Sequence, residues 1–203
     1  MKHILNGVVG ALATLLAAGP AGAAQAAEIK VMVNEVREDG ITKIPAVIRV
    51  EGKFGDAEDD AFNDAIDGIR NATIYFHSQG GAIRSGVMLG RIIRARGFHT
   101  AVANREICYS ACALAWLAGK RRFIGYSAAV GFHAPHDKRG ERVAAAEAII
   151  ATYVRHLGLS DATAAYVLAT DPKDLTFMTN ELDGKAHGIA LTWISIPTYT
   201  PLP

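Results

Sequence analysis

Short apolar runs and amphipathic stretches follow one another along the first half of the chain. Three runs rich in Val and Ile have the length and composition of β-strands: residues 28–36, 44–52 and 72–76. Between the second and third runs, residues 56–70 begin with acidic side chains and then place Phe62, Ala65 and Ile69 at helical spacing. The pattern therefore predicts an amphipathic helix between strands.

The alternation continues to the C-terminal end. Apolar positions at helical spacing predict helices at residues 82–96, 111–120, 141–156 and 162–170 and near 180–188. Further extended segments are predicted at residues 99–104, 121–133 and 189–194. Gly97 is placed to end the first of these helices, and Ser160 or Asp161 to cap the fourth. Because strands that alternate with helices need crossover connections, we expect one α/β domain with a largely parallel β-sheet covered by helices.

The N-terminal residues have the pattern of a secretory signal peptide. Lys2 precedes an apolar stretch at residues 4–18, and Ala24 and Ala26 form an A-x-A arrangement. The alternative is an uncleaved membrane anchor, but glycines and a proline interrupt the apolar stretch and no stop-transfer flank follows it. We expect a signal peptide at residues 1–27, export to the periplasm or secretion, and no stable membrane span after cleavage.

Composition and charge narrow the class of protein further. Half of the 203 residues are hydrophobic, which favours one domain with a substantial core at residues 28–196, followed by a loose, proline-containing tail at residues 197–203. The chain has 21 Lys and Arg and 20 Asp and Glu, so removal of Lys2 with the signal peptide leaves equal numbers. Four arginines are expected on a solvated helix face and strand edge: Arg94, Arg96, Arg121 and Arg122. Without a basic stripe, no nucleic-acid partner is expected.

One serine stands where candidate chemistry is concentrated. Ser110 lies where strand-like sequence gives way to helical sequence, so it is either a helix-capping residue or a nucleophile. A nucleophile needs a base and N–H donors for the developing oxyanion. His133, at the end of an apolar strand, is the candidate base, with His136 as a competitor. Gly80 and Gly81 follow a predicted buried strand and leave N–H groups open to a ligand.

The only two cysteines flank this serine. Cys108 and Cys112 are four positions apart, which on a helical turn separates their Cα atoms by about 6 Å. That distance allows a disulfide in an oxidising compartment, and it equally suits two buried free thiols. The spacing is not the redox C-x-x-C, and two sulfurs alone do not make a zinc site, so no metal is predicted.

Four segments, in their sequence and in their order along the chain, resemble those of the Clp-type serine peptidases of the Clp/crotonase fold. They are HSQGGAIRSGVMLGRIIRARG, CYSACALAWLAGKRRF, AAVGFHAP and DPKDLTFMTNELDGKAHGIAL, and they lie within about residues 70–192. The similarity is stronger to the exported bacterial relatives, in which two cysteines commonly flank the serine. The resemblance implies a single α/β domain of repeated β-β-α units and a homo-oligomer, since this fold commonly forms rings or trimers.

The resemblance also implies a role for individual residues. It makes Ser110 the nucleophile and His133 the general base, with the backbone N–H groups of Gly81 and Ala111 as oxyanion donors. Where the family has Asn and Pro around its first serine, this chain has His77 and Gln79, which we expect to alter the substrate groove.

The resemblance also implies an acid as the third member of a catalytic triad, but no acid stands at the family's position for it. The family's acid lies two residues before an aromatic residue, and here that position is Leu175, before Phe177. Asp174 is the predicted acid and Asp171 the alternative. A site of serine and histidine alone would need water or a backbone carbonyl to orient the base.

The function implied is that of an exported, ATP-independent serine peptidase that cleaves peptide bonds in a peptide or protein substrate through an acyl-enzyme and needs no cofactor. Two rival functions remain on the same fold. A non-catalytic binding or scaffold protein is one of them, because a fold does not guarantee chemistry. A crotonase-type acyl-CoA enzyme is the other, although export disfavours it because CoA substrates are intracellular.

Overall fold

The computed structural model describes residues 26–198. The predicted signal peptide, apart from its last two residues, and the end of the predicted tail lie outside the described residues. In residues 26–198, no helix has both the length and the apolar character needed to cross a membrane. Thr198, in the predicted tail, donates a hydrogen bond from its hydroxyl to the Asn104 carbonyl oxygen, at 2.7 Å.

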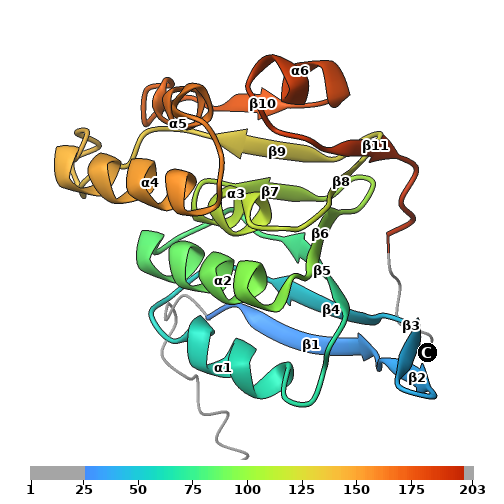
Figure 1. The fold of residues 1–203 in the computed structure, drawn as a ribbon. Coiled ribbons are helices and arrows are strands. Elements are labelled where there is room, and N and C mark those ends of the chain that lie inside the picture. Colours follow the sequence, from blue (N-terminus) through green and yellow to red (C-terminus); the bar gives the residue numbers. More distant parts are fainter. Residues whose placement is uncertain (1–25, 199–203) are drawn as a thin grey trace, which may run out of the picture.

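A six-stranded sheet forms the centre of the domain (Figure 1). In spatial order its strands are β1 (Glu28–Val33), β4 (Ala46–Glu51), β5 (Ala72–His77), β6 (His99–Val102), β8 (Arg122–Gly125) and β11 (Thr192–Ile194). Every neighbouring pair is parallel except β1 and β4. The prediction of an α/β domain with a largely parallel sheet is therefore confirmed.

A second sheet of three strands continues from the end of β5. Its strands are β10 (Thr176–Met178), β9 (Ala129–Phe132) and β7 (Ile107–Tyr109), with β7 parallel to β9. The Tyr109 N–H donates to the Ser78 carbonyl oxygen at 3.0 Å, which joins β7 to the residue after β5. A separate hairpin is formed by β2 (Val36–Glu38) and β3 (Ile41–Ile44).

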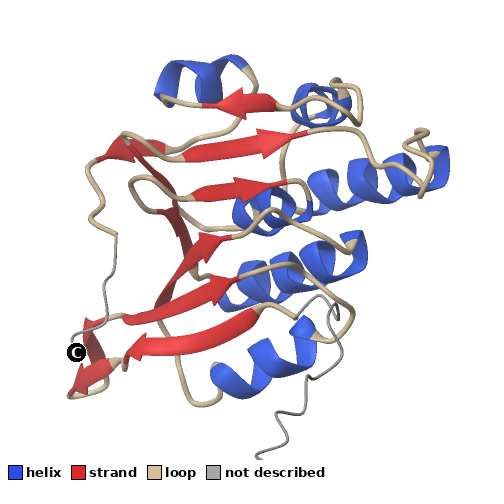
Figure 2. Ribbon diagram, turned by 180° about the vertical axis from the view of Figure 1, so that it is seen from behind, coloured by secondary structure: helices blue, strands red, loops and turns tan. Residues whose placement is uncertain are grey.

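Six helices pack against these sheets in residues 26–198, and Figure 2 shows most of them gathered on one side of the strands. They are α1 (Glu58–Ala65), α2 (Ile83–Arg96), α3 (Ala111–Leu117), α4 (Ala144–His156), α5 (Asp161–Leu168) and α6 (Glu181–Ala186). The element orders β6-β7-α3 and β8-β9-α4 are two β-β-α units. Both capping predictions are confirmed: Gly97 ends α2 in the left-handed conformation, and the Ser160 hydroxyl accepts the Thr163 N–H at the start of α5.

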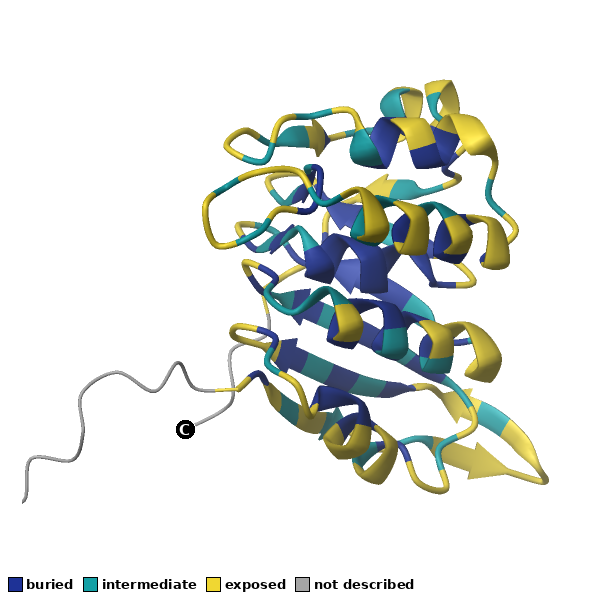
Figure 3. Cartoon of the chain, turned by 90° about the vertical axis from the view of Figure 1, so that its left-hand side faces the viewer, coloured by how far each residue is buried: buried dark blue, intermediate teal, exposed yellow. Residues whose placement is uncertain are grey.

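The core lies between the sheets and the helices, so burial follows the period of each element (Figure 3). In β4 and β5, alternate residues such as Ile48, Ile74 and Phe76 are fully buried, while their neighbours are partly exposed. Helix α3 is buried along its whole length. The helix after Ser110 is therefore one of the most enclosed elements of the fold.

Three features differ from the sequence-based expectation. Residues 121–133 form not one extended segment but β8 and β9, which belong to different sheets. Strand β7 and the hairpin were not predicted because strands of three or four residues are too short to show periodicity. Arg122 is not solvated but 6% exposed, and its Nε donates to the Leu117 carbonyl oxygen at the end of α3.

Candidate active site

Ser110 occupies the turn between β7 and α3. Its backbone has φ 55° and ψ −123°, in the positive-φ region that non-glycine residues rarely adopt. Its side chain makes no capping hydrogen bond to α3, so the helix-capping interpretation is wrong. Backbone strain of this kind is commonly found at functional sites.

Gly80 and Gly81 lie directly against this turn. A Cβ atom on Gly80 would lie 2.8 Å from the Ser110 Cβ and 3.0 Å from the Ala111 nitrogen. A Cβ on Gly81, whose φ is 142°, would lie 2.1 Å from the Phe54 carbonyl oxygen. Only glycine fits at these two positions. The structure thus brings the Gly-Gly segment and the start of α3 together.

Two backbone N–H groups in this region lack an internal acceptor. The Gly80 N–H donates to the Ser78 hydroxyl at 3.0 Å. The N–H groups of Gly81 and Ala111, by contrast, have no hydrogen-bond acceptor among residues 26–198. Unpaired backbone N–H groups are rare in protein interiors. They are the groups from which an oxyanion would accept hydrogen bonds.

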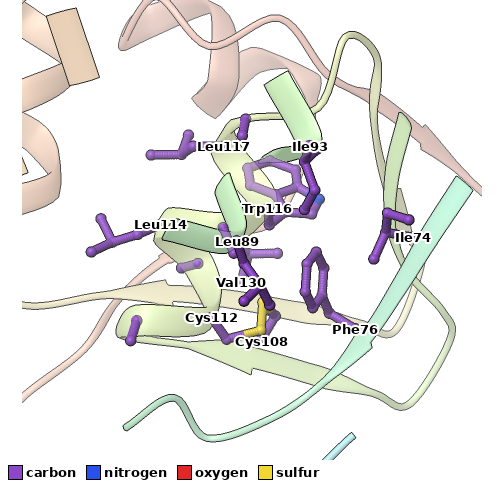
Figure 4. Close-up of a cluster of buried hydrophobic side chains, with 14 of the residues drawn as sticks. Ile74, Phe76, Leu89, Ile93, Cys108, Cys112, Leu114, Trp116, Leu117 and Val130 are labelled. Carbon is purple, nitrogen blue, oxygen red and sulfur yellow. A yellow bond between two sulfur atoms is a disulfide. The ribbon is translucent and has the colours of Figure 1, made fainter. Parts of the chain in front are cut away.

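A disulfide and the core hold the turn in place. Cys108 and Cys112 are bonded to each other, with their Cα atoms 5.2 Å apart. Figure 4 shows this disulfide packed among buried side chains that include Phe76, Leu89 and Val130. Helix α2 also packs closely on the first residue of α3, because a Cβ on Gly86 would lie 2.2 Å from the Ala111 carbonyl oxygen. The sequence left both a disulfide and two free thiols open, and the structure has the disulfide, which spans the serine.

His133 shares a small pocket with Ser110. The other residues that line this pocket are mainly apolar: Ile83, Ala111, Leu114, Phe132, Pro135, Ile150 and Val167. His133 follows directly after β9, the strand that pairs with β7, so the two side chains project from the ends of neighbouring strands. In residues 26–198, the Ser110 hydroxyl donates to neither His133 nor any other acceptor. Catalytic hydrogen bonds are often long or unformed without substrate.

A backbone carbonyl, not an acid, orients His133. Its Nδ1 lies 2.8 Å from the carbonyl oxygen of Ala134. Because a carbonyl oxygen only accepts, Nδ1 carries the proton, which leaves the lone pair of the neutral ring on Nε2. This is the tautomer that a general base needs. His136 stacks on the outside of His133, with ring centroids 5.6 Å apart, and is not part of the pocket.

Neither acid of the sequence analysis forms a hydrogen bond or an ion pair with His133. Asp174 is exposed, and its side chain makes no hydrogen bond within the described part of the chain. Asp171 is also exposed, and its carboxylate accepts the Lys173 N–H at 3.0 Å. Leu175, at the position where the family has its acid, approaches Gly131 in β9. Neither carboxylate is paired with the histidine in this structure.

His77 and Gln79 line a different pocket. This polar pocket also includes Glu51, Lys53 and Ser78, and the pocket of Ser110 shares no residue with it. A hydrogen bond from Arg49 at 2.8 Å holds the pKa of the Glu51 carboxyl below its usual range. No group of three or more potential metal ligands gathers within residues 26–198.

The pocket-lining side chains of α4 and α5 were missed from the sequence. Ile150 and Val167 look like ordinary core positions of amphipathic helices, and only the packing of α4 on α5 and α2 brings them to Ser110. A signal existed for Pro135, which is the last residue of the segment AAVGFHAP that carries the candidate base.

Comparison with solved structures gives the same fold. The chain is similar to a mutant of a membrane-bound stomatin-specific protease, with 14% identity, 72% of this chain and 77% of the other covered, and a TM-score of 0.56. It is also similar to ClpP1 from Listeria monocytogenes, with 15% identity, 75% and 92% covered, and a TM-score of 0.56. The ClpP protease catalytic domain from Plasmodium falciparum is 17% identical, with 75% and 85% covered and a TM-score of 0.52.

The chain has the Clp/crotonase-like fold. No known family model matches the sequence, and no curated protein does. At these levels of identity the similarity concerns the fold, so the chemistry has to be argued from the site itself.

Proposed function

We propose that this protein is a serine peptidase whose nucleophile is Ser110. The observation that carries the proposal is the backbone of Ser110: a strained positive φ at a strand-to-helix turn, with a hydroxyl that caps nothing. The next residue, Ala111, has an N–H without an acceptor among the described residues, and so has Gly81, the neighbour of the glycine that lies against Ser110. The fold similarity to named proteases supports the proposal.

The proposed mechanism is acyl transfer by a serine and histidine pair. Nε2 of His133 takes the proton from the Ser110 hydroxyl as the oxygen attacks the peptide carbonyl. The N–H groups of Gly81 and Ala111 stabilise the tetrahedral oxyanion. His133 then gives its proton to the leaving amine, and water hydrolyses the acyl-enzyme by the reverse sequence. The Ala134 carbonyl oxygen holds the histidine ring through its Nδ1–H and has the orienting role that an acid has in a triad.

The lining of the pocket beside Ser110 suggests which peptides fit. Leu114, Ile150 and Val167 offer no charge and no hydrogen-bonding group to a substrate side chain. We therefore propose that the side chain on the acyl side of the scissile bond is small and apolar. We also propose that the protein is exported, works without ATP and forms a homo-oligomer. These three points rest on the sequence pattern and the family resemblance.

Hydrolysis of a mixed peptide library in the absence of ATP tests this function. We expect wild-type protein to cleave after small apolar residues, Ser110→Ala to leave the library intact, and Ser127→Ala, an exposed serine outside the pocket, to behave as wild type. Cleavage that survives in Ser110→Ala contradicts the proposal. A folded wild-type protein that cleaves nothing favours the binding or scaffold function instead.

A further inference from the structure

A buried carboxylate lies next to the end of the predicted signal peptide. Glu58, the first residue of α1, is 2% exposed. Its Oε1 accepts the Ala27 N–H at 3.2 Å and the Gly55 N–H at 2.6 Å. Its Oε2 is buried and has no hydrogen-bond partner among the described residues.

The neighbouring acid shows what Glu58 lacks. Asp59 is also buried, but Arg84 forms an ion pair with it at 3.3 Å. No Lys, Arg or His within residues 26–198 forms an ion pair with Glu58. A buried carboxylate without a cation is costly, and proteins normally provide a partner.

The sequence around Ala27 supplies a cation if the signal peptide is removed. The A-x-A arrangement of Ala24 and Ala26 is that of a signal peptidase site, at which the bond after the second alanine is cut, one residue before the end of the range 1–27 expected from the sequence. Hydrolysis of the Ala26–Ala27 bond by one water leaves a carboxyl group on the leader and an α-ammonium group on Ala27. Ala26 is exposed and Ala27 is 9% exposed, so this bond lies where the chain enters the domain.

We propose that Glu58 is the receptor for the α-ammonium group of the mature protein, which begins at Ala27. The nitrogen that becomes the ammonium is the atom that already donates to Oε1. An ammonium has three N–H donors where the amide has one, so it can also reach the unpartnered Oε2. Cleavage thus converts a hydrogen bond of the precursor into a buried ion pair of the mature protein.

This ion pair lies next to the segment after β4 that positions Gly80 and Gly81. Gly55, which shares Oε1 with Ala27, directly follows Phe54. The Phe54 N–H donates to the Gly80 carbonyl oxygen at 2.8 Å, and its carbonyl oxygen accepts the Ala82 N–H at 2.9 Å. The backbone on both sides of Gly81 is therefore held by Phe54. The consequence for activity rests on the proposed function. Processing at Ala27 would fix the Gly81 N–H, the proposed oxyanion donor, and make the mature protein more active than the precursor.

The test combines two changes, one of which removes the charge of the ammonium group and the other that of the carboxylate. N-terminal acetylation of the chain that begins at Ala27 keeps an N–H donor there but removes the charge, and Glu58→Gln keeps an acceptor but removes the carboxylate. We expect acetylation to lower the thermal midpoint by roughly 3 °C or more in wild type and by much less in Glu58→Gln. Asp60→Asn, an exposed acid in the same helical turn, is the matched control and should leave the effect of acetylation unchanged.

Two results overturn the proposal. One is a drop in midpoint upon acetylation that is equal in wild type and Glu58→Gln, or absent in both. The other is an intact mass of the exported protein that places its first residue elsewhere than at Ala27. These stability and mass readouts do not depend on peptidase activity. Failure of all variants to react at Ser110 would therefore count against the proposed function alone, and not against the ammonium site.

Discussion

The nucleophile and the base of the candidate site are held in different ways. Ser110 and its two N–H donors are fixed by the buried core, through the Cys108–Cys112 disulfide, the packing of α3 and two glycines with no room for a side chain. His133 is partly buried, and its ring is held by one hydrogen bond to the next residue's carbonyl oxygen. Asp174 is exposed and takes no part in holding it.

The difference shows which parts of the chemistry depend on tertiary packing. A strained serine and two unpaired N–H groups need a rigid surrounding structure, because the backbone would otherwise relax and pair with itself. A neutral histidine needs only the correct tautomer, and a local carbonyl provides that. An acid that is out of register is therefore compatible with a working serine and histidine pair.

Replacing the base should have the largest effect. We expect His133→Ala to lower kcat on the order of 10⁴-fold, at the upper end of what a positioned general base contributes, with little change in thermal midpoint. His136→Ala is the matched control because its ring stacks outside the pocket, and it should retain most activity. Steady-state kinetics on one peptide measures both. If His136→Ala is the more damaging change, the assignment of the base is wrong.

A side chain at the oxyanion donor should have the next largest effect. In Gly81→Ala the new Cβ would lie 2.1 Å from the Phe54 carbonyl oxygen, so the backbone has to shift and the N–H moves with it. We expect kcat to fall about 10²- to 10³-fold, as for loss of one oxyanion donor, while KM changes little. Gly140→Ala, at another positive-φ glycine with open space around its Cβ, controls for backbone strain alone.

Removing the disulfide should have an intermediate effect on both stability and activity. A cross-link over four positions contributes about 2 kcal/mol in the chain-entropy treatment. We expect the double variant Cys108→Ala/Cys112→Ala to lose about 4 to 8 °C in thermal midpoint, and to lose activity because the turn that presents Ser110 loosens. Calorimetry together with peptide hydrolysis checks this. Full stability and full activity in the double variant would show that the bond does not support the turn.

The smallest effect is expected at Asp174. Because this carboxylate is exposed and pairs with nothing described, Asp174→Asn should change kcat by no more than about twofold, and Asp171→Asn likewise. The measurement is kcat/KM for each variant. A loss of about 10⁴-fold at either position would instead indicate an acid that orients the histidine during catalysis. The claim that His133 is held by a local carbonyl oxygen alone would then be wrong.

Local signals made much of this fold predictable from the sequence. Gly97 and Ser160 were assigned correctly because a helix cap depends only on residues a few positions away. Strand β7 has three residues, and its pairing with β9 depends on a segment 22 positions later. The positive φ of Ser110 was likewise hidden, since the residue type does not favour it and only the surrounding packing imposes it. The orienting role of the Ala134 carbonyl carried no side-chain signal at all.

The central claim, that Ser110 is an activated nucleophile, is tested most directly by covalent labelling with a fluorophosphonate and mapping of the labelled residue by mass spectrometry. We expect one label per chain on Ser110 in wild type and in Ser127→Ala, and none in Ser110→Ala. A folded wild-type protein that takes up no label, or takes it up at a different residue, would contradict the claim.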